Sequence, residues 1–123
     1  MSGQVFKPAG NGPFPALLWN HGSERDPRPY LPTLARPFAS AGYVVFAAFR
    51  RGHATSPGPY ILDEVRVAPP RLRAHLTVYL LEEQVADQLA GFSFLKGQLY
   101  VDPLRIAVMG GSHGGIHTLL AGP

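Results

Sequence analysis

A serine flanked by glycines stands near the end of the sequence, in the segment Gly110-Gly111-Ser112-His113-Gly114. An apolar run, Leu104 to Met109, precedes this segment, and Ile116, Leu119 and Leu120 indicate a helix after it. A serine on a tight turn between a strand and a helix has a strained backbone, and side chains at positions 110 and 114 would collide with the neighbouring elements. The pattern therefore predicts a strand–turn–helix unit with Ser112 at its tip.

Two earlier apolar runs predict further strands. The first, Ala16 to Trp19, is bounded by prolines before it and by Asn20-His21-Gly22 after it. The second, Tyr43 to Phe49, is continuously apolar and rich in β-branched and aromatic residues, which is typical of a parallel strand covered on both faces.

Helices are predicted between these strands. Apolar residues three and four apart indicate a helix from Leu31 to Ala39 that ends before Gly42. Pro37 predicts that this helix starts late or has a kink there. A later helix ends at Lys96-Gly97. Its apolar face consists of Val78, Leu81, Val85, Leu89 and Phe92. The segment between Arg50 and Arg73 is rich in Gly, Pro and Arg without a sustained period, and we expect a long loop there.

The alternation of strands and helices predicts an α/β fold in three layers, α/β/α, with a short parallel sheet. The chain has 123 residues and no linker between two units, so residues 1–123 are expected to form a single domain.

Composition excludes several classes of site and partner. The chain has no cysteine, which rules out disulfides, thiolate metal sites and a cysteine nucleophile. No residues have the spacing of a metal site, and we expect no metal or other cofactor. The charge of +3 comes from scattered arginines, so a nucleic-acid partner is not expected. No apolar run approaches the roughly 18 residues of a membrane span, and a cytoplasmic location is the default expectation.

Three segments in this order resemble the α/β-hydrolase superfamily, most closely its dienelactone hydrolase and prolyl-oligopeptidase-like branches. Phe14 to Gly22 resembles the third strand of that fold and its His-Gly loop. Phe49 to Ser56 resembles the Arg-Gly-His-x-x-Ser turn, and Val101 to Gly115 resembles the fifth strand and the nucleophile elbow.

The resemblance implies a role for each matching residue. Ser112 would be the catalytic nucleophile, and the backbone N–H groups of Ser23 and His113 would form the oxyanion hole that stabilises the tetrahedral intermediate of acyl transfer. His21, Gly22, Gly110 and Gly114 would support the loop and the elbow. Arg51, Gly52 and His53 would brace the loop from beneath. The implied substrate is a small-molecule ester or a related acyl compound.

The sequence departs from the family after the elbow. The family order is nucleophile, then Asp or Glu, then His, but only eleven residues follow Ser112, so we expect a truncated fold that ends after the elbow. His113 and His117 are alternatives for the base, although a surface or helix-packing role is favoured for both. His75 begins the long helix, and Glu82, Glu83 and Asp87 are interpreted as its solvated face.

The strand Leu104 to Met109 would leave an unpaired edge, which predicts a homo-oligomer through that edge or a complex that supplies the missing residues in trans. Two functions remain open: a serine hydrolase, incomplete or completed in trans, and a non-catalytic half-fold that acts as an oligomerising or ligand-binding scaffold.

Overall fold

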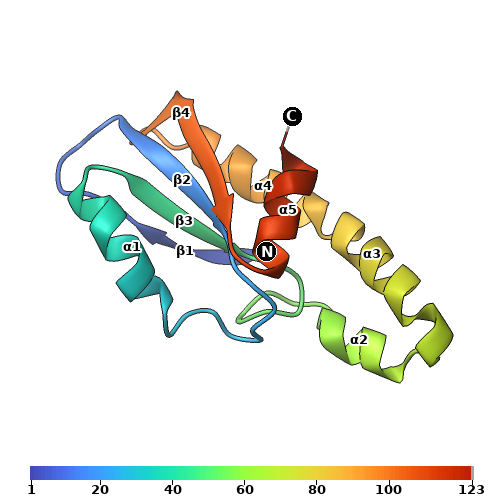
Figure 1. Ribbon diagram of the computed structural model, residues 1–123. Coiled ribbons are helices and arrows are strands. Elements are labelled where there is room, and N and C mark those ends of the chain that lie inside the picture. Colours follow the sequence, from blue (N-terminus) through green and yellow to red (C-terminus); the bar gives the residue numbers. More distant parts are fainter. Residues whose placement is uncertain (123) are drawn as a thin grey trace.

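The structure is a computed structural model that describes residues 1–122, and it contains a four-stranded sheet with helices on both faces (Figure 1). The spatial order of the strands is β1-β3-β2-β4. Their bounds are β1, Ser2–Phe6; β2, Phe14–Asn20; β3, Val44–Phe49; and β4, Val101–Gly110. Strands β2, β3 and β4 are parallel, as predicted, whereas β1 pairs antiparallel with β3 and was not predicted.

Helices cover the two faces of the sheet unequally. Helix α1 (Leu31–Ser40) packs on β1 and β3, whereas α4 (Val85–Lys96) and α5 (His113–Ala121) pack on the opposite face (Figure 1). The predicted three-layer α/β/α architecture is therefore confirmed. Helix α1 runs through Pro37 without ending there. None of the helices in the described part of the chain has the length and apolar character needed to cross a membrane.

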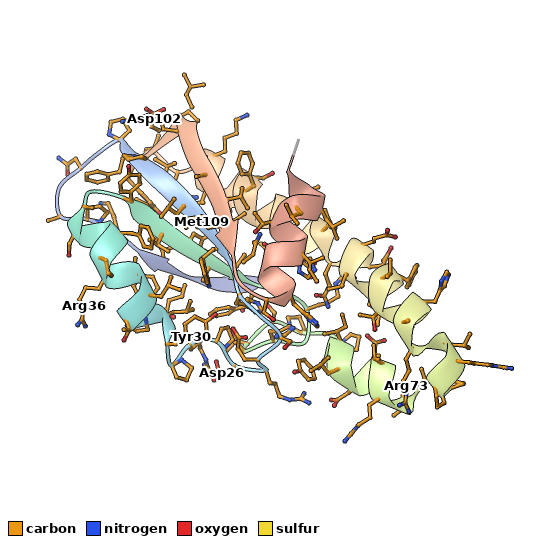
Figure 2. The ribbon with its side chains drawn as sticks, viewed as in Figure 1. Asp26, Tyr30, Arg36, Arg73, Asp102 and Met109 are labelled. Carbon is orange, nitrogen blue, oxygen red and sulfur yellow. The ribbon has the colours of Figure 1, made fainter. Side chains whose placement is uncertain are left out.

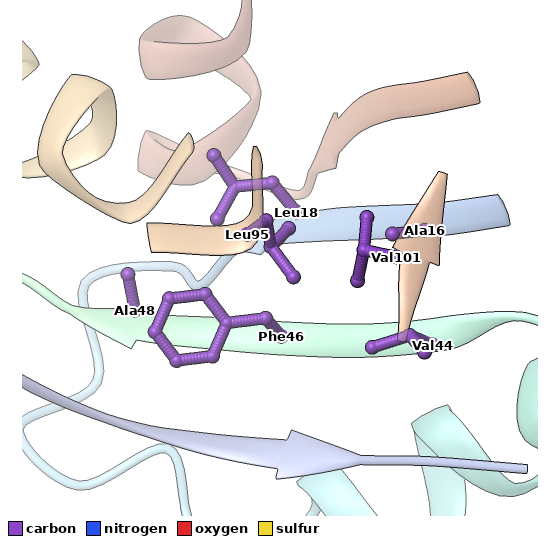
Figure 3. Packing of buried hydrophobic residues seen from close by; sticks show 7 residues of the cluster. All are labelled: Ala16, Leu18, Val44, Phe46, Ala48, Leu95 and Val101. Atoms are coloured by element: carbon purple, nitrogen blue, oxygen red, sulfur yellow. The ribbon is translucent and has the colours of Figure 1, made fainter. Parts of the chain in front are cut away.

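The core consists of two parts, one on each face of the sheet, because successive residues of a strand point to opposite faces. On the α4 side, Leu18 of β2 and Phe46 of β3 pack against Leu95 of α4 (Figure 3). On the α1 side, Leu17 of β2 and its β3 neighbour Val45 pack with α1. Every residue of β3 is buried, which confirms the expectation of a strand covered on both faces.

The segment predicted as a long loop contains helices, so that prediction was wrong. Helix α2 (Ile61–Val67) and the short 3₁₀ helix η1 (Pro70–Leu72) lie between β3 and helix α3 (Arg73–Glu83). Asp63 in the first turn of α2 and Arg66 in its last turn complement the helix dipole. The order of these charges, an acid before a base, was a usable signal for a helix, although the segment lacks a regular apolar pattern.

The predicted helix before Lys96 is two helices, because Gln84 separates α3 from α4. The predicted apolar face was also wrong in part, since Val78 and Leu89 are exposed. The buried face consists of Leu81, Gln84, Gln88, Gly91 and Leu95. The prediction counted only apolar residues and therefore overlooked two buried glutamines and a glycine. The predicted face was rotated about the helix axis relative to the face that is buried.

Candidate active site

Ser112 lies at the turn between β4 and α5. It is exposed and has φ +53° and ψ −127°, a conformation that residues with a side chain rarely adopt. A Cβ at Gly110 would overlap the carbonyl oxygen of Gly114, and a Cβ at Gly114 would overlap that of Asn20. Both glycines are therefore required by close backbone contacts, one inside the turn and the other between the turn and β2.

The loop that follows β2 packs directly against this turn. A Cβ added at Gly22 would lie 3.6 Å from the Cβ of Ser112. The connection is reinforced by Asn20, whose Nδ2 donates to Oγ1 of Thr118 at 2.9 Å, while that hydroxyl donates to the carbonyl oxygen of Gly114. Side-chain and backbone contacts thus join the end of β2 to the first turns of α5.

His21 is fully buried in this loop and is a neutral structural residue. Its Nδ1 lies 2.9 Å from the carbonyl oxygen of Gly22 and donates to it, while Nε2 accepts the backbone N–H of Arg50 at 3.3 Å. Burial, together with the nearby charge of Arg50, lowers the pKa of His21 to about 2. His21 is therefore neutral at neutral pH, and both of its ring nitrogens are engaged by backbone groups.

Arg50, a buried residue of the β3–α2 connection, holds the loop by its backbone carbonyls. Its Nη1 donates to the carbonyl oxygen of His21 at 2.7 Å and its Nη2 to that of Gly22 at 2.6 Å, while Nε donates to Gln84. In a trans peptide the C=O and N–H groups point in opposite directions. The N–H of Ser23, which shares a peptide with the Gly22 carbonyl, therefore points away from Arg50.

Other contacts fix the rest of the loop. The Tyr60 hydroxyl donates to the carbonyl oxygen of Ser23, and Nδ1 of the buried His53 donates to that of Glu24 at 2.8 Å. His53 thus braces the loop as expected. Arg51 does not, because its side chain pairs with Asp87 on α4 at 2.9 Å. The bracing expected of Arg51 belongs to Arg50.

A hollow of about 270 Å³ opens beside Ser112. It is lined by Trp19, Gly22, Glu24, Tyr30, Gly111 and Ser112. Tyr30 lies in the connection between β2 and α1, below the point where β4 turns into α5 (Figure 2). Its hydroxyl donates to Oε1 of Glu24 at 2.6 Å, and burial followed by this contact raises the pKa of Tyr30 to about 12.

Solved esterases share this arrangement of strands and helices. Est1E of Butyrivibrio proteoclasticus, solved with ferulic acid bound, gives a TM-score of 0.72 at 19% identity over 98% of this chain and 42% of that one. Esterase 2 of Thermogutta terrifontis phosphonylated by cyclosarin gives 0.62 at 22% identity over 94% and 39%. A structure of Est2 from the same organism with butyrate bound gives 0.62 at 23% identity over 94% and 37%.

The family model of the prolyl oligopeptidase family matches residues 77–122, a segment that includes α4, β4 and α5. The fold is that of an α/β-hydrolase. The fold implied by the sequence resemblance is thereby confirmed, and the chain spans 37% to 42% of the chain length in these three esterase structures.

The other histidines near the elbow of this α/β-hydrolase fold do not line the hollow. His117 is fully buried, and its Nδ1 donates to the carbonyl oxygen of His113 at 2.8 Å. Burial, followed by the charge of Arg50, lowers the pKa of His117 to about 4 and also lowers that of His113. His117 is thus packed inside the protein, whereas His113 is half-buried, and neither lines the hollow.

The remaining candidate groups lie away from the hollow. His75, Glu82 and Glu83 are exposed on α3, whereas Asp87 is held by Arg51 instead of forming part of a solvated face. Among residues 1–122 no group of three or more His, Cys, Asp or Glu side chains could hold a metal ion.

Sequence reasoning gave no site role to Arg50 or to three residues that line the hollow, Trp19, Glu24 and Tyr30. Glu24 had a usable signal, because it follows the carboxyl end of a parallel strand, the edge at which α/β sheets bind ligands. Arg50 had no comparable local signal, since its contacts reach residues 28 to 34 positions away. Tyr30 bonds to Glu24 only six residues away, but no sequence pattern singled out its hydroxyl.

Proposed function

We propose that this chain is the nucleophile-bearing half of a serine hydrolase that cleaves carboxylic esters, equivalent to the N-terminal half of an α/β-hydrolase domain. The observation that carries the proposal is the contact between the loop after β2 and the turn at Ser112, which share one hollow. Acyl transfer needs a nucleophile beside preorganised hydrogen-bond donors, and this contact brings the two segments together.

In the proposed reaction the Oγ of Ser112 attacks the ester carbonyl, and the alcohol leaves as the acyl-serine forms. The N–H groups of Ser23 and His113 stabilise the negative charge on the carbonyl oxygen. The N–H of Ser23 points away from Arg50, and that of His113 lies at the first position of α5, where a helix provides no internal acceptor. Water then hydrolyses the acyl-serine and releases the acid.

In this proposal the general base and its acid come from outside residues 1–122. The buried His21 and His117 are not placed to take the proton of Ser112. Strand β4 pairs with β2 on one side only, so within the described residues it forms an edge of the sheet. We propose that a second copy of the chain covers this edge, because an unpaired edge strand favours pairing with another chain.

The test is covalent labelling with a fluorophosphonate, which transfers its phosphonyl group to an activated serine and releases fluoride. Wild-type protein, Ser112→Ala and the control Ser93→Ala, an exposed residue on α4, would be labelled, and their native masses recorded. We expect labelling at position 112 in wild-type protein and in the Ser93 variant, in an oligomer. Folded wild-type protein that stays unlabelled would overturn the proposal and favour the non-catalytic half-fold.

A further inference from the structure

The hollow beside Ser112 is bordered by one carboxylate and two aromatic rings. Glu24 is the only charged residue among the six that line it, and Trp19 and Tyr30 are the aromatic ones. Nothing in the reaction proposed above uses these three side chains. A carboxylate near the place where an oxyanion forms would repel that charge, so its presence requires a further explanation.

The carboxylate of Glu24 is fixed through one oxygen and open at the other. Oε1 accepts the N–H of Gly22 at 3.1 Å and the hydroxyl of Tyr30 at 2.6 Å. Oε2 has no hydrogen-bond or ion-pair partner in the part of the chain that the structure describes. A Cβ at Gly22 would meet this Oε2 at 2.5 Å and the Cβ of Ser112 at 3.6 Å, so both groups border the same spot.

Glu24 forms no ion pair with an arginine among the described residues. The Arg50 guanidinium donates to the carbonyl oxygens of His21 and Gly22 and to Gln84, and it forms no ion pair with the Glu24 carboxylate. Arg25, the next residue in sequence, pairs with Asp63 at 2.8 Å. Burial lowers the pKa of Arg50 and the charge of Glu24 partly offsets this, so the two charges interact, but Oε2 of Glu24 has no direct partner among the described residues and stays open to a bound cation.

From this arrangement we propose that the hollow is a cation subsite, and that the ester cleaved at Ser112 carries a quaternary ammonium or protonated amine. A cation between Glu24 and the reacting carbonyl would offset the repulsion between carboxylate and oxyanion. Aromatic rings such as those of Trp19 and Tyr30 attract cations through their π-faces, which adds to the attraction of the carboxylate. The substrate part of this inference rests on the proposed function, whereas cation binding does not.

Binding can be measured without catalysis, because Trp19 is the only tryptophan of the chain and lines the hollow. Its fluorescence would be followed during titration with choline and with 3,3-dimethylbutan-1-ol, the uncharged isostere of choline, at constant ionic strength. We expect choline to bind more tightly than the isostere, by about tenfold, and Glu24→Gln to abolish this difference. The control Glu82→Gln, at an exposed site on α3, should retain it.

Equal affinities for choline and its isostere in wild-type protein would overturn the inference, as would choline affinity that is the same in wild-type protein and Glu24→Gln. The fluorophosphonate experiment separates this result from the proposed function. Labelling at Ser112 without choline selectivity would support the proposed hydrolase and contradict the cation subsite. Choline selectivity without labelling would support the cation subsite and contradict the proposed hydrolase.

If labelling occurs, hydrolysis of butyrylcholine and of 3,3-dimethylbutyl butyrate would test the substrate class. We expect kcat/KM to favour the choline ester in wild-type protein and in Glu82→Gln. In Glu24→Gln the two esters should be cleaved at similar rates. A preference for the choline ester that survives in Glu24→Gln would overturn the assignment of this residue.

Discussion

Nη2 of Arg50 donates to the carbonyl oxygen of Gly22 at 2.6 Å, across 28 residues of sequence, and so fixes the peptide that carries the N–H of Ser23. The same side chain holds the carbonyl oxygen of His21 at 2.7 Å. Planarity and the separate donors of the guanidinium group allow it to hold two adjacent carbonyls at once, whereas an ammonium group has no such fork. The orientation of the loop therefore depends on an arginine that does not line the hollow.

We expect Arg50→Lys to lower the free energy of unfolding by about 1–3 kcal/mol, because at least one buried acceptor loses its donor. It should also slow fluorophosphonate labelling of Ser112, since the loop loses its fixed orientation. Urea denaturation and the labelling rate would measure the two effects. Arg51→Lys is the matched control, because Arg51 pairs with Asp87 outside the loop. Equal labelling rates in wild-type protein and Arg50→Lys would contradict the role given to Arg50.

Neighbouring glycines in α5 should differ sharply in their tolerance of a methyl group. A Cβ at Gly114 would overlap the carbonyl oxygen of Asn20, whereas a Cβ at Gly115 would have its nearest contact at 3.6 Å. Gly114→Ala should therefore destabilise the fold by several kcal/mol, as overpacking of a rigid backbone does. Gly115→Ala should be neutral or stabilising by up to about 1 kcal/mol, through helix propensity. Thermal unfolding of both variants provides the comparison, and equal melting temperatures would refute it.

Thr118 should matter for its hydroxyl and not for its shape. Thr118→Val keeps the branched side chain but leaves Nδ2 of the buried Asn20 without an acceptor, which we expect to cost about 1–3 kcal/mol of unfolding free energy. Thr118→Ser retains the hydroxyl and should retain most of the stability. Chemical denaturation of the pair would decide, and a valine variant as stable as the serine variant would show that this hydrogen bond contributes nothing.

Stability should fall as the pH drops below the ordinary histidine range. The pKa of His117 is lowered from 6.5 to about 4 and that of His21 to about 2, mainly by burial, so the unfolded chain binds these protons more readily than the folded one. The stabilising contribution is complete above pH 6.5 and decreases between 6.5 and 4 for His117. For His21 the decrease continues toward 2. Each group contributes a slope of up to about 1.4 kcal/mol per pH unit.

Free energies of unfolding between pH 7 and pH 5 would test this dependence. His117→Gln should have a shallower slope than wild-type protein, whatever its absolute stability, because one proton no longer enters the unfolding equilibrium. The same substitution at the exposed His75 is the matched control. Identical slopes for wild-type protein and His117→Gln would mean that His117 is protonated equally in the folded and unfolded states.

Local patterns predicted the parts of the fold that depend on neighbours in sequence. The turn at Ser112 was predictable because glycines two residues before and after the serine are required by contacts within the turn and with the adjacent strand. Strand β3 was predictable because it is buried on both faces and its sequence is apolar throughout. In both cases the physical cause acts over a few residues.

Long-range contacts account for what was missed. Strand β1 owes its conformation to pairing with β3, more than forty residues away in the register Ser2 to Phe49, and its own sequence has little strand character. Gln84 is buried because it accepts a hydrogen bond from Arg50, 34 residues earlier. Because Gln84 is polar, the sequence pattern did not place it on the buried face of the helices. Neither partner is recognisable from a window of neighbouring residues.

Strand β4 has two roles, because it carries the turn of Ser112 at one end and forms an edge of the sheet along its length. Whatever pairs with that edge is brought within a few residues of the proposed nucleophile. Under the proposed function, pairing of a second copy with β4 and the reactivity of Ser112 are then coupled, because both depend on the same strand. If a second copy covers the edge as proposed, dilution would remove it, and the rate of fluorophosphonate labelling at Ser112 would then depend on protein concentration.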